Sequence, residues 1–229
     1  MQHTEVDHLV VAAATLADGE AWCERLLGQA SAPGGRHALM GTHNRLLALG
    51  SPAFPRCYLE IIAIDPQAPP PGRARWFDLD NPLLQARLHH DGPQLVGFVA
   101  RSAMVDIHRW GLINCRLQPG PTLKASRDTP QGLLQWQIVV PDDGRPLAGG
   151  AVPTLIQWQG PHPADHLPVS AVQLQALALR GLPEQAAQVL RLRGVQRPAD
   201  AGTALQATLD TPNGRVTLAG PPAPRTPAP

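Results

Sequence analysis

The feature that most constrains this fold is the order of short apolar runs at the start of the chain. A β-branched run over residues 5–12 is followed by apolar residues at helical spacing over 16–27, and Gly28 then provides a natural helix stop. Three more short runs follow, separated by turn residues, at 37–41, 44–49 and 57–64. This order predicts a β-α-β-β-β unit.

The same order returns in the second half of the chain. A strand-like run over 95–100 precedes a helical pattern over 104–111. Further strands are predicted at 114–117 with 123–126, at 134–140 and at 154–159. Between the two units, the Asn81-Pro82 pair starts a short helix that we interpret as a linker. The recurrence indicates an internal duplication.

A third, shorter cycle occupies the C-terminal part. It has a strand, a helix over 183–192 and two strands that flank the hairpin signal Asn213-Gly214. We therefore predict an α+β fold of tandem βαβββ modules with a partial third module. The predicted parts are a first module at 1–66, a linker helix at 67–93, a second module at 94–160, the partial module at 161–220 and a disordered tail at 221–229.

Composition limits the partners and the compartment. The chain has 229 residues, 43% hydrophobic, with a formal net charge of +1 and scattered basic residues. We expect neither nucleic acid nor membrane partners, because there is no basic patch and no apolar run of about 18 residues. The chain has an odd number of cysteines, which are widely spaced, and no visible export signal. These features favour a cytoplasmic protein with reduced thiols. A small-molecule ligand is the expected partner.

Several stretches resemble the glyoxalase-like domain family of the vicinal-oxygen-chelate (glyoxalase/bleomycin resistance/dioxygenase) superfamily, which implies a bacterial-type protein. The residues that carry the resemblance are Asp7–Val11, Gly34–Asn44, Tyr58–Ile62, Arg75–Phe77, Leu155–Trp158 and His162-Pro163. The resemblance covers about residues 5–220. It implies paired modules whose curved, mixed sheets close around a cleft.

The resemblance also implies a metal site, because the first and last strands of each module in that superfamily supply histidine and glutamate to a divalent ion. His8 and Glu60 occupy these positions in the first module. In the second module an apolar residue near Val96 and the amide of Gln157 replace them, and an amide is a poor substitute for a carboxylate. We expect His8, Glu60 and Gln157 to hold zinc, nickel, manganese or iron weakly, unless another histidine completes the site. The alternative is that His8 and Glu60 line a wet pocket without metal.

Six other residues are candidates for substrate binding. His37 and His43 flank a predicted turn, and their alternative is a surface loop. Arg127 suits a carboxylate or phosphate, or else lies on the surface. Polar and apolar residues alternate along two predicted strands, so their amide and indole side chains face either a bound ligand or the solvent. The set is His37, His43, Asn44, Arg127, Gln135 and Trp158.

Two functions remain open from the sequence. The first is a metal-dependent lyase, isomerase or ring-cleaving enzyme acting on a small oxygen-rich molecule, with Glu60 as ligand or catalytic base. The second is a metal-free binding or sequestering protein of the bleomycin-resistance type, which the missing ligands of the second module favour. The C-terminal cycle could also dock another subunit, so a homodimer is a further alternative.

Overall fold

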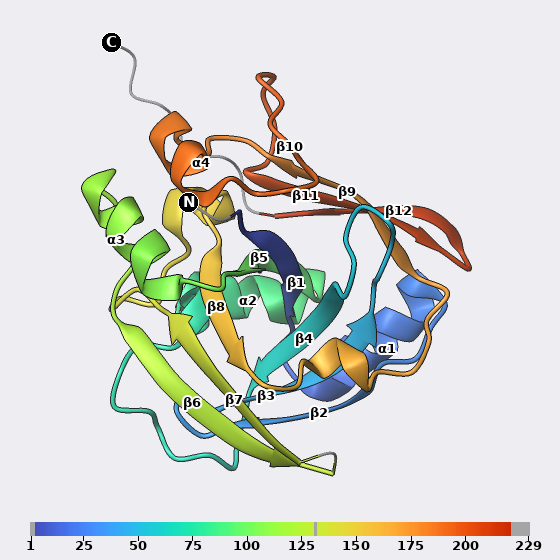
Figure 1. Ribbon diagram of the computed structural model, residues 1–229. Helices are drawn as coiled ribbons and strands as arrows, with labels where there is room; N and C mark the ends of the chain where they lie inside the picture. Colours follow the sequence, from blue (N-terminus) through green and yellow to red (C-terminus); the bar gives the residue numbers. More distant parts are fainter. Residues whose placement is uncertain (1–2, 131, 221–229) are drawn as a thin grey trace.

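A computed structural model describes residues 3–130 and 132–220 and places two similar units side by side in one curved sheet (Figure 1). The first unit contains β1 (Glu5–Ala12), α1 (Leu16–Leu27), β2 (Ala32–His37), β3 (Thr42–Ala48) and β4 (Tyr58–Ile64). The second contains β5 (Gln94–Arg101), α3 (Val105–Asn114), β6 (Thr122–Thr129), β7 (Gly132–Val139) and β8 (Thr154–Gln159). The predicted α+β fold of tandem βαβββ units is confirmed. The predicted tail at 221–229 lies outside the described residues.

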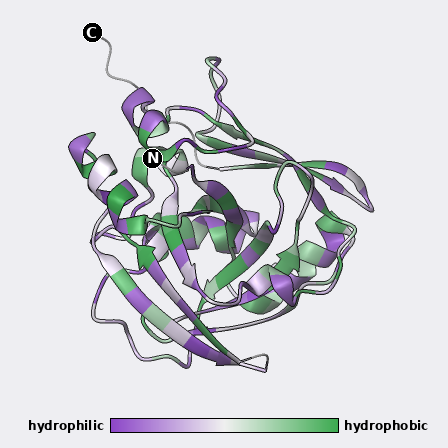
Figure 2. Cartoon of the chain, in the orientation of Figure 1, coloured by the Kyte–Doolittle hydropathy of each residue, from purple (hydrophilic) through white to green (hydrophobic). Residues whose placement is uncertain are grey.

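The eight strands follow the order β2-β3-β4-β1-β5-β8-β7-β6, so the two units are joined at their first strands. β1 and β5 are antiparallel, whereas β1 pairs with β4, and β5 with β8, in parallel. The sheet bends until its edge strands β2 and β6 come into contact, which encloses a cleft on the concave side. Figure 2 shows hydrophobic residues along the central strands, and nearly all residues of β1 and β5 are buried.

Local sequence explains where α1 begins and ends. The Thr15 hydroxyl accepts a hydrogen bond from the Asp18 N–H at the N-terminus. Gly28 ends the helix at φ 66°, where it has no β-carbon to clash. Trp22, Cys23 and Leu27 face the convex side of the sheet and contribute to its core. The helix therefore covers the outer face and leaves the concave face to the cleft.

Two predicted strands are wrong. The second strand of the first unit is Ala32–His37, and residues 38–41 form the turn instead. This is an edge strand, where proline and glycine are tolerated because one side needs no hydrogen-bond partner. Asn114 is the last residue of α3, and residues 115–117 form the turn that ends the helix, with the Leu117 N–H bonded to the Leu112 carbonyl at 3.1 Å. The linker between the units contains α2 (Pro82–Asp91) and a short 3-10 turn at Trp76–Asp78.

The C-terminal segment forms a second sheet on the outer face of the first. It consists of β9 (Gln173–Leu179), α4 (Glu184–Leu190), β10 (Val195–Gln196), β11 (Leu205–Thr211) and β12 (Gly214–Ala219), with strand order β10-β9-β11-β12. This order differs from that of the two units. Its apolar residues share one core with α1, and α4 packs on α3. No helix in the described ranges is long and apolar enough to cross a membrane.

Candidate functional site

His8 and Glu60 lie together on the concave face of the sheet. β1 and β4 pair in parallel with His8 opposite Tyr58 and Val10 opposite Glu60. Because alternate residues share a face, these strands direct both polar side chains into the cleft. His8 Nε2 lies 3.4 Å from Glu60 Oε2, and the two residues are only 4% and 6% exposed. The structure therefore brings an imidazole and a carboxylate together in a buried setting.

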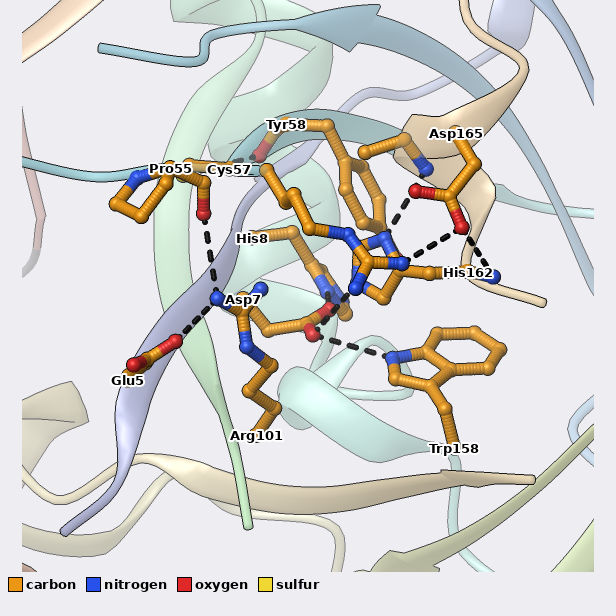
Figure 3. A network of polar contacts seen from close by, with 12 residues as sticks. Glu5, Asp7, His8, Pro55, Cys57, Tyr58, Arg101, Trp158, His162 and Asp165 are labelled. Carbon is orange, nitrogen blue, oxygen red and sulfur yellow. Dashed lines mark hydrogen bonds and ion pairs between the residues drawn. The ribbon is translucent and has the colours of Figure 1, made fainter. Parts of the chain in front are cut away.

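The carboxylate of Asp7 lies next to the His8 ring and holds it in place (Figure 3). The pairing of β1 with β5 shifts between Val6 and His8, and this bulge lets consecutive side chains enter one cluster. Asp7 is fully buried, and its Oδ1 accepts a hydrogen bond from His8 Nδ1 at 2.7 Å. Its Oδ2 accepts from Trp158 Nε1 at 3.1 Å. The carboxylate thus fixes the ring of His8 so that Nε2 points to Glu60.

His162 is a further donor to Asp7 and comes from the segment after β8. Its Nδ1 accepts from the Ala164 N–H at 3.1 Å, so the proton of a neutral ring lies on Nε2. Nε2 donates to Asp7 Oδ2 at 2.9 Å. Asp165 anchors this segment by accepting from the backbone N–H of His162 and from Arg56. The chain after β8 therefore covers Asp7 and excludes water from it.

The buried charges shift the pKa values of these groups. Burial alone raises the pKa of Asp7, but hydrogen bonds from His162 and His8 hold it well below its usual range. Burial lowers the pKa of His8, yet the neighbouring carboxylates Asp7 and Glu60 raise it to about 9. Burial raises the pKa of Glu60, but the hydrogen bond and charge of His8 bring it to about 2. At neutral pH the trio is one imidazolium between two carboxylates.

Three polar or aromatic residues complete the floor of the cleft. Asn44 donates from Nδ2 to Glu60 Oε1 at 2.5 Å, and its Oδ1 accepts from the Gly35 N–H at 2.7 Å. A β-carbon at Gly34 would lie 2.1 Å from Asn44 Oδ1, so β2 needs glycine there. Burial lowers the pKa of His37 to about 4, which keeps the ring neutral, and Nε2 lies 3.7 Å from Glu60 Oε1. Tyr58 stacks on His8 with ring centroids 4.5 Å apart.

Two adjoining cavities occupy the cleft. The inner one, about 30 Å³, lies at His8 and Glu60 and has aromatic walls formed by Trp76, Phe77, Trp136 and Trp158. The second cavity is about 330 Å³ and is lined by β2, β6, β7 and the segment after β8. The two share Leu46, Arg127 and Pro163. The cleft therefore has a small inner part next to His8 and Glu60 and a larger adjoining part.

The structure separates the candidate substrate-binding residues into two groups. His37, Asn44, Arg127 and Trp158 line the inner cavity. Gln135 is exposed and flanked by Leu134 and Trp136, which face the concave core, so its side chain points away. His43 lies between Thr42 and Asn44 on β3 and likewise lines neither cavity. Strand alternation explains why neighbours in sequence do not share the cleft.

The three candidate metal ligands do not converge. Gln157 Oε1 accepts from the Val105 N–H at 3.0 Å, so it faces α3 while Ile156 and Trp158 face the cleft. One oxygen of Glu60 is already engaged by Asn44. In the parts of the chain that the structure describes, no group of three or more His, Cys, Asp or Glu side chains is arranged to hold a metal ion. Catalytic zinc sites use three protein ligands, so this donor set does not fit a tightly held ion.

Three residues of the site escaped the sequence interpretation. Asp7 precedes His8 directly, but the β-bulge that brings both side chains into one cluster cannot be recognised from a single sequence. Tyr58 was part of the recognised stretch, yet its stacking on His8 depends on strand register. His162 was among the residues that carry the resemblance but was not assigned to the site, because it is 155 residues from Asp7. Only the tertiary fold brings it to the site.

Two βαβββ units joined around a cleft, with histidine and glutamate on paired strands of one unit, place the protein in the vicinal-oxygen-chelate class. The chain belongs to the glyoxalase-like domain family, whose model matches residues 6–208.

Several solved structures are similar to this chain. A hypothetical protein from Staphylococcus aureus has a TM-score of 0.56 at 12% identity, covering 94% of this chain and 86% of that chain. Methylmalonyl-CoA epimerase from Streptomyces coelicolor, in complex with 2-nitronate-propionyl-CoA, has a TM-score of 0.41 at 13% identity, covering 69% and 97%. The epimerase from Mycobacterium tuberculosis has a TM-score of 0.37 at 16% identity, covering 67% and 85%. No curated protein sequence matches the chain. The Staphylococcus structure supports the fold alone.

The charged state of His8 predicts a loss of stability at alkaline pH. The pKa of His8 in the folded protein, about 9, lies above its ordinary value of 6.5. Its contribution to the free energy of unfolding is therefore full below pH 6.5 and is lost as pH rises through 9. We expect the free energy of unfolding to fall by on the order of 2 to 3 kcal/mol between pH 6.5 and 9. Urea unfolding followed by tryptophan fluorescence measures it. His8→Gln should lack this decrease, and NMR titration of the His8 ring should give a pKa near 9; a value near 6.5 would contradict the prediction.

Proposed function

We propose that this protein is an enzyme that moves a proton on a small oxygen-rich molecule bound in the cleft, in an isomerase or lyase reaction. The observation that carries the proposal is the buried Asp7-His8-Glu60 chain, with His8 Nδ1 2.7 Å from Asp7 and His8 Nε2 3.4 Å from Glu60. Buried charges are costly to desolvate, and groups with strongly perturbed pKa values gather at functional sites.

The two groups that face the inner cavity have complementary roles. Glu60 is a carboxylate and serves as the base that removes a proton from a carbon next to a carbonyl. His8 is an imidazolium and donates its Nε2 proton to the carbonyl oxygen, so that an enol forms without a free oxyanion. Asp7 stabilises the imidazolium and holds its orientation. Return of the proton to a different carbon or face gives isomerisation, and loss of a leaving group gives a lyase reaction.

Substrate entry adjusts the basicity of Glu60. In the free protein the hydrogen bond and charge of His8 hold the pKa of Glu60 at about 2, which makes it a weak base. A carbonyl compound that enters between His8 and Glu60 separates the charges and accepts the His8 hydrogen bond itself. The pKa of Glu60 then rises because burial, which opposes the charged form, is no longer offset to the same extent. The base is thus activated only when the cavity is filled.

Sequestration without reaction is the second candidate, and the aromatic walls favour it. Trp136 and Trp158 lie with ring centroids 5.5 Å apart and line the inner cavity with Trp76 and Phe77. Such walls suit an apolar or aromatic ligand. A protein that only binds has no need for the buried carboxylates and imidazolium, which is why we favour the enzyme.

Deuterium exchange tests the proposal directly. The protein is incubated in D2O with a panel of small hydroxyketones and 2-oxo acids, and incorporation at the carbon next to the carbonyl is followed by proton NMR. We expect at least one compound to exchange much faster than in buffer alone. Binding of panel members without any accelerated exchange would instead support sequestration.

Metal binding is expected to be weak. Because Gln157 faces α3, His8 is an imidazolium and one oxygen of Glu60 is engaged by Asn44, calorimetry with manganese, zinc and nickel should give dissociation constants no tighter than micromolar, and a chelator should remove the metal fully. Exchange activity should survive treatment with a chelator. Nanomolar binding that is lost in both His8→Ala and Glu60→Ala would contradict this and assign a true metal centre.

A further inference from the structure

Arg127 spans the seam where the curved sheet closes. It lies on edge strand β6, and its guanidinium reaches across the opposite edge strand β2 to Asn44 of β3, with Nη1 3.5 Å from Asn44 Oδ1. A β-carbon at Gly35 would lie 2.3 Å from Nη1, so the guanidinium rests directly on the bare backbone of β2. This position is on the cleft side of the sheet, between the two cavities, and Arg127 lines both of them.

The guanidinium is half-buried. Other arginines of this sheet and its connections form ion pairs, including Arg45 with Glu20, Arg101 with Glu5 and Arg75 with Asp80. Over residues 3–130 and 132–220, no aspartate or glutamate lies within ion-pair distance of Arg127. A partly desolvated cation that faces a cavity without a counter-ion is suited to an anionic ligand.

The larger cavity determines what else the ligand carries. Its volume of about 330 Å³ falls within the usual range for small-molecule sites. Its walls are mainly apolar, with Ala32, Pro33, Leu46, Leu134, Leu167 and Pro168 among them. Arg127 is the one permanently charged side chain among the described residues of this lining, which also includes His166. An anion at Arg127 would therefore be joined to an apolar body.

The balance of charge selects a carboxylate over a phosphate. Two carboxylates and one imidazolium leave the inner cluster next to Arg127 with a net negative charge, which opposes each further negative charge in the cavity. A carboxylate adds one negative charge and matches the planar fork of a single guanidinium. A phosphate monoester adds up to two negative charges beside Glu60, with no second permanent cation in the larger cavity to offset them.

We propose that the substrate is a monocarboxylic acid with an apolar body, whose carboxylate pairs with Arg127. The apolar body fills the larger cavity, and the carbonyl-bearing carbon reaches His8 and Glu60 in the inner one. The role of the carbonyl rests on the proposed function, whereas the pairing of the carboxylate with Arg127 is independent of it.

Calorimetry with unreactive probes tests the pairing. We use 4-phenylbutanoate, 4-phenylbutanamide and 3-phenylpropyl phosphate, which share an aromatic body and differ in the charge of the head group. Wild-type protein should bind the acid about tenfold or more tightly than the amide, because a charge-assisted hydrogen bond is lost with the amide. The phosphate should bind more weakly than the acid.

Variants at Arg127 separate charge from geometry. Arg127→Gln should bind acid and amide equally, and Arg127→Lys should keep part of the preference because it retains the charge without the fork. Lys124→Gln is the matched control: it removes a positive charge from the same strand on the exposed face and should behave as wild type. Thermal unfolding of each variant confirms that it is folded.

Three results would overturn the proposal. These are no measurable binding of the acid by wild type, an acid preference that survives in Arg127→Gln, or tighter binding of the phosphate than of the acid. The hydrogens next to the carbonyl of a carboxylate or a simple amide are far less acidic than those of a ketone, so binding of these probes is measured without turnover. Failure of the proton-transfer proposal would leave these binding constants unchanged.

Discussion

Replacing Glu60 by glutamine should reduce deuterium exchange by about 10²- to 10⁴-fold, the usual contribution of a positioned general base. Glutamine keeps the shape of the side chain and can still contact Asn44, which lies 2.5 Å from Glu60 Oε1. It cannot accept a proton from carbon at neutral pH. Ligand binding should persist, so that the loss appears in turnover. NMR exchange rates at saturating substrate provide the measurement.

The control for this substitution is Glu24→Gln, which makes the same chemical change on the exposed side of α1. Its exchange rate should equal that of wild type. If Glu60→Gln retained wild-type exchange, Glu60 would have no role as a base, and the proton acceptor would have to be sought elsewhere in the cleft. A folded Glu60→Gln protein that no longer binds ligand would instead assign Glu60 to ligand binding.

Replacing Leu177 by alanine should lower the free energy of unfolding by about 2 to 5 kcal/mol, the usual effect of truncating a fully buried leucine. Leu177 lies on β9, is 0% exposed and belongs to the core shared by the C-terminal sheet and α1. The missing methyl groups leave a cavity that the rigid sheets cannot fill. Urea unfolding should show one transition with a lower midpoint.

Val169→Ala serves as the comparison, because Val169 is 97% exposed and its truncation removes almost no buried surface. Its stability should remain within about 0.5 kcal/mol of wild type. A separate early transition in Leu177→Ala, with the rest of the protein unfolding as before, would show that the C-terminal sheet is an independent unit. The shared core and the bond from the Leu174 N–H to the Leu49 carbonyl at 3.0 Å argue for one cooperative unit.

Alternation of side chains between the two faces of a strand separates residues that the sequence prediction placed together in the site. Gln157 and Trp158 are adjacent on one strand, and both were predicted to face the ligand, although an extended strand directs neighbours to opposite faces. The structure places Trp158 at the inner cavity and Gln157 against α3. Gln135 was assigned to the cleft for the same reason, and the buried neighbour Trp136 occupies that face instead.

Most helices and strands and their repetition could be predicted from the sequence, because apolar periodicity and turn residues act over short distances. It also placed His8 and Glu60 as polar residues inside apolar strands. The side chains that surround these two residues are brought together only by the tertiary fold. A bulge in β1 turned Asp7 toward His8, the segment after β8 delivered His162, and closure of the sheet carried Arg127 across to Asn44. Each of these contacts joins strands or loops through register and curvature, which are set by the packing of the whole sheet and cannot be read from any local stretch of sequence.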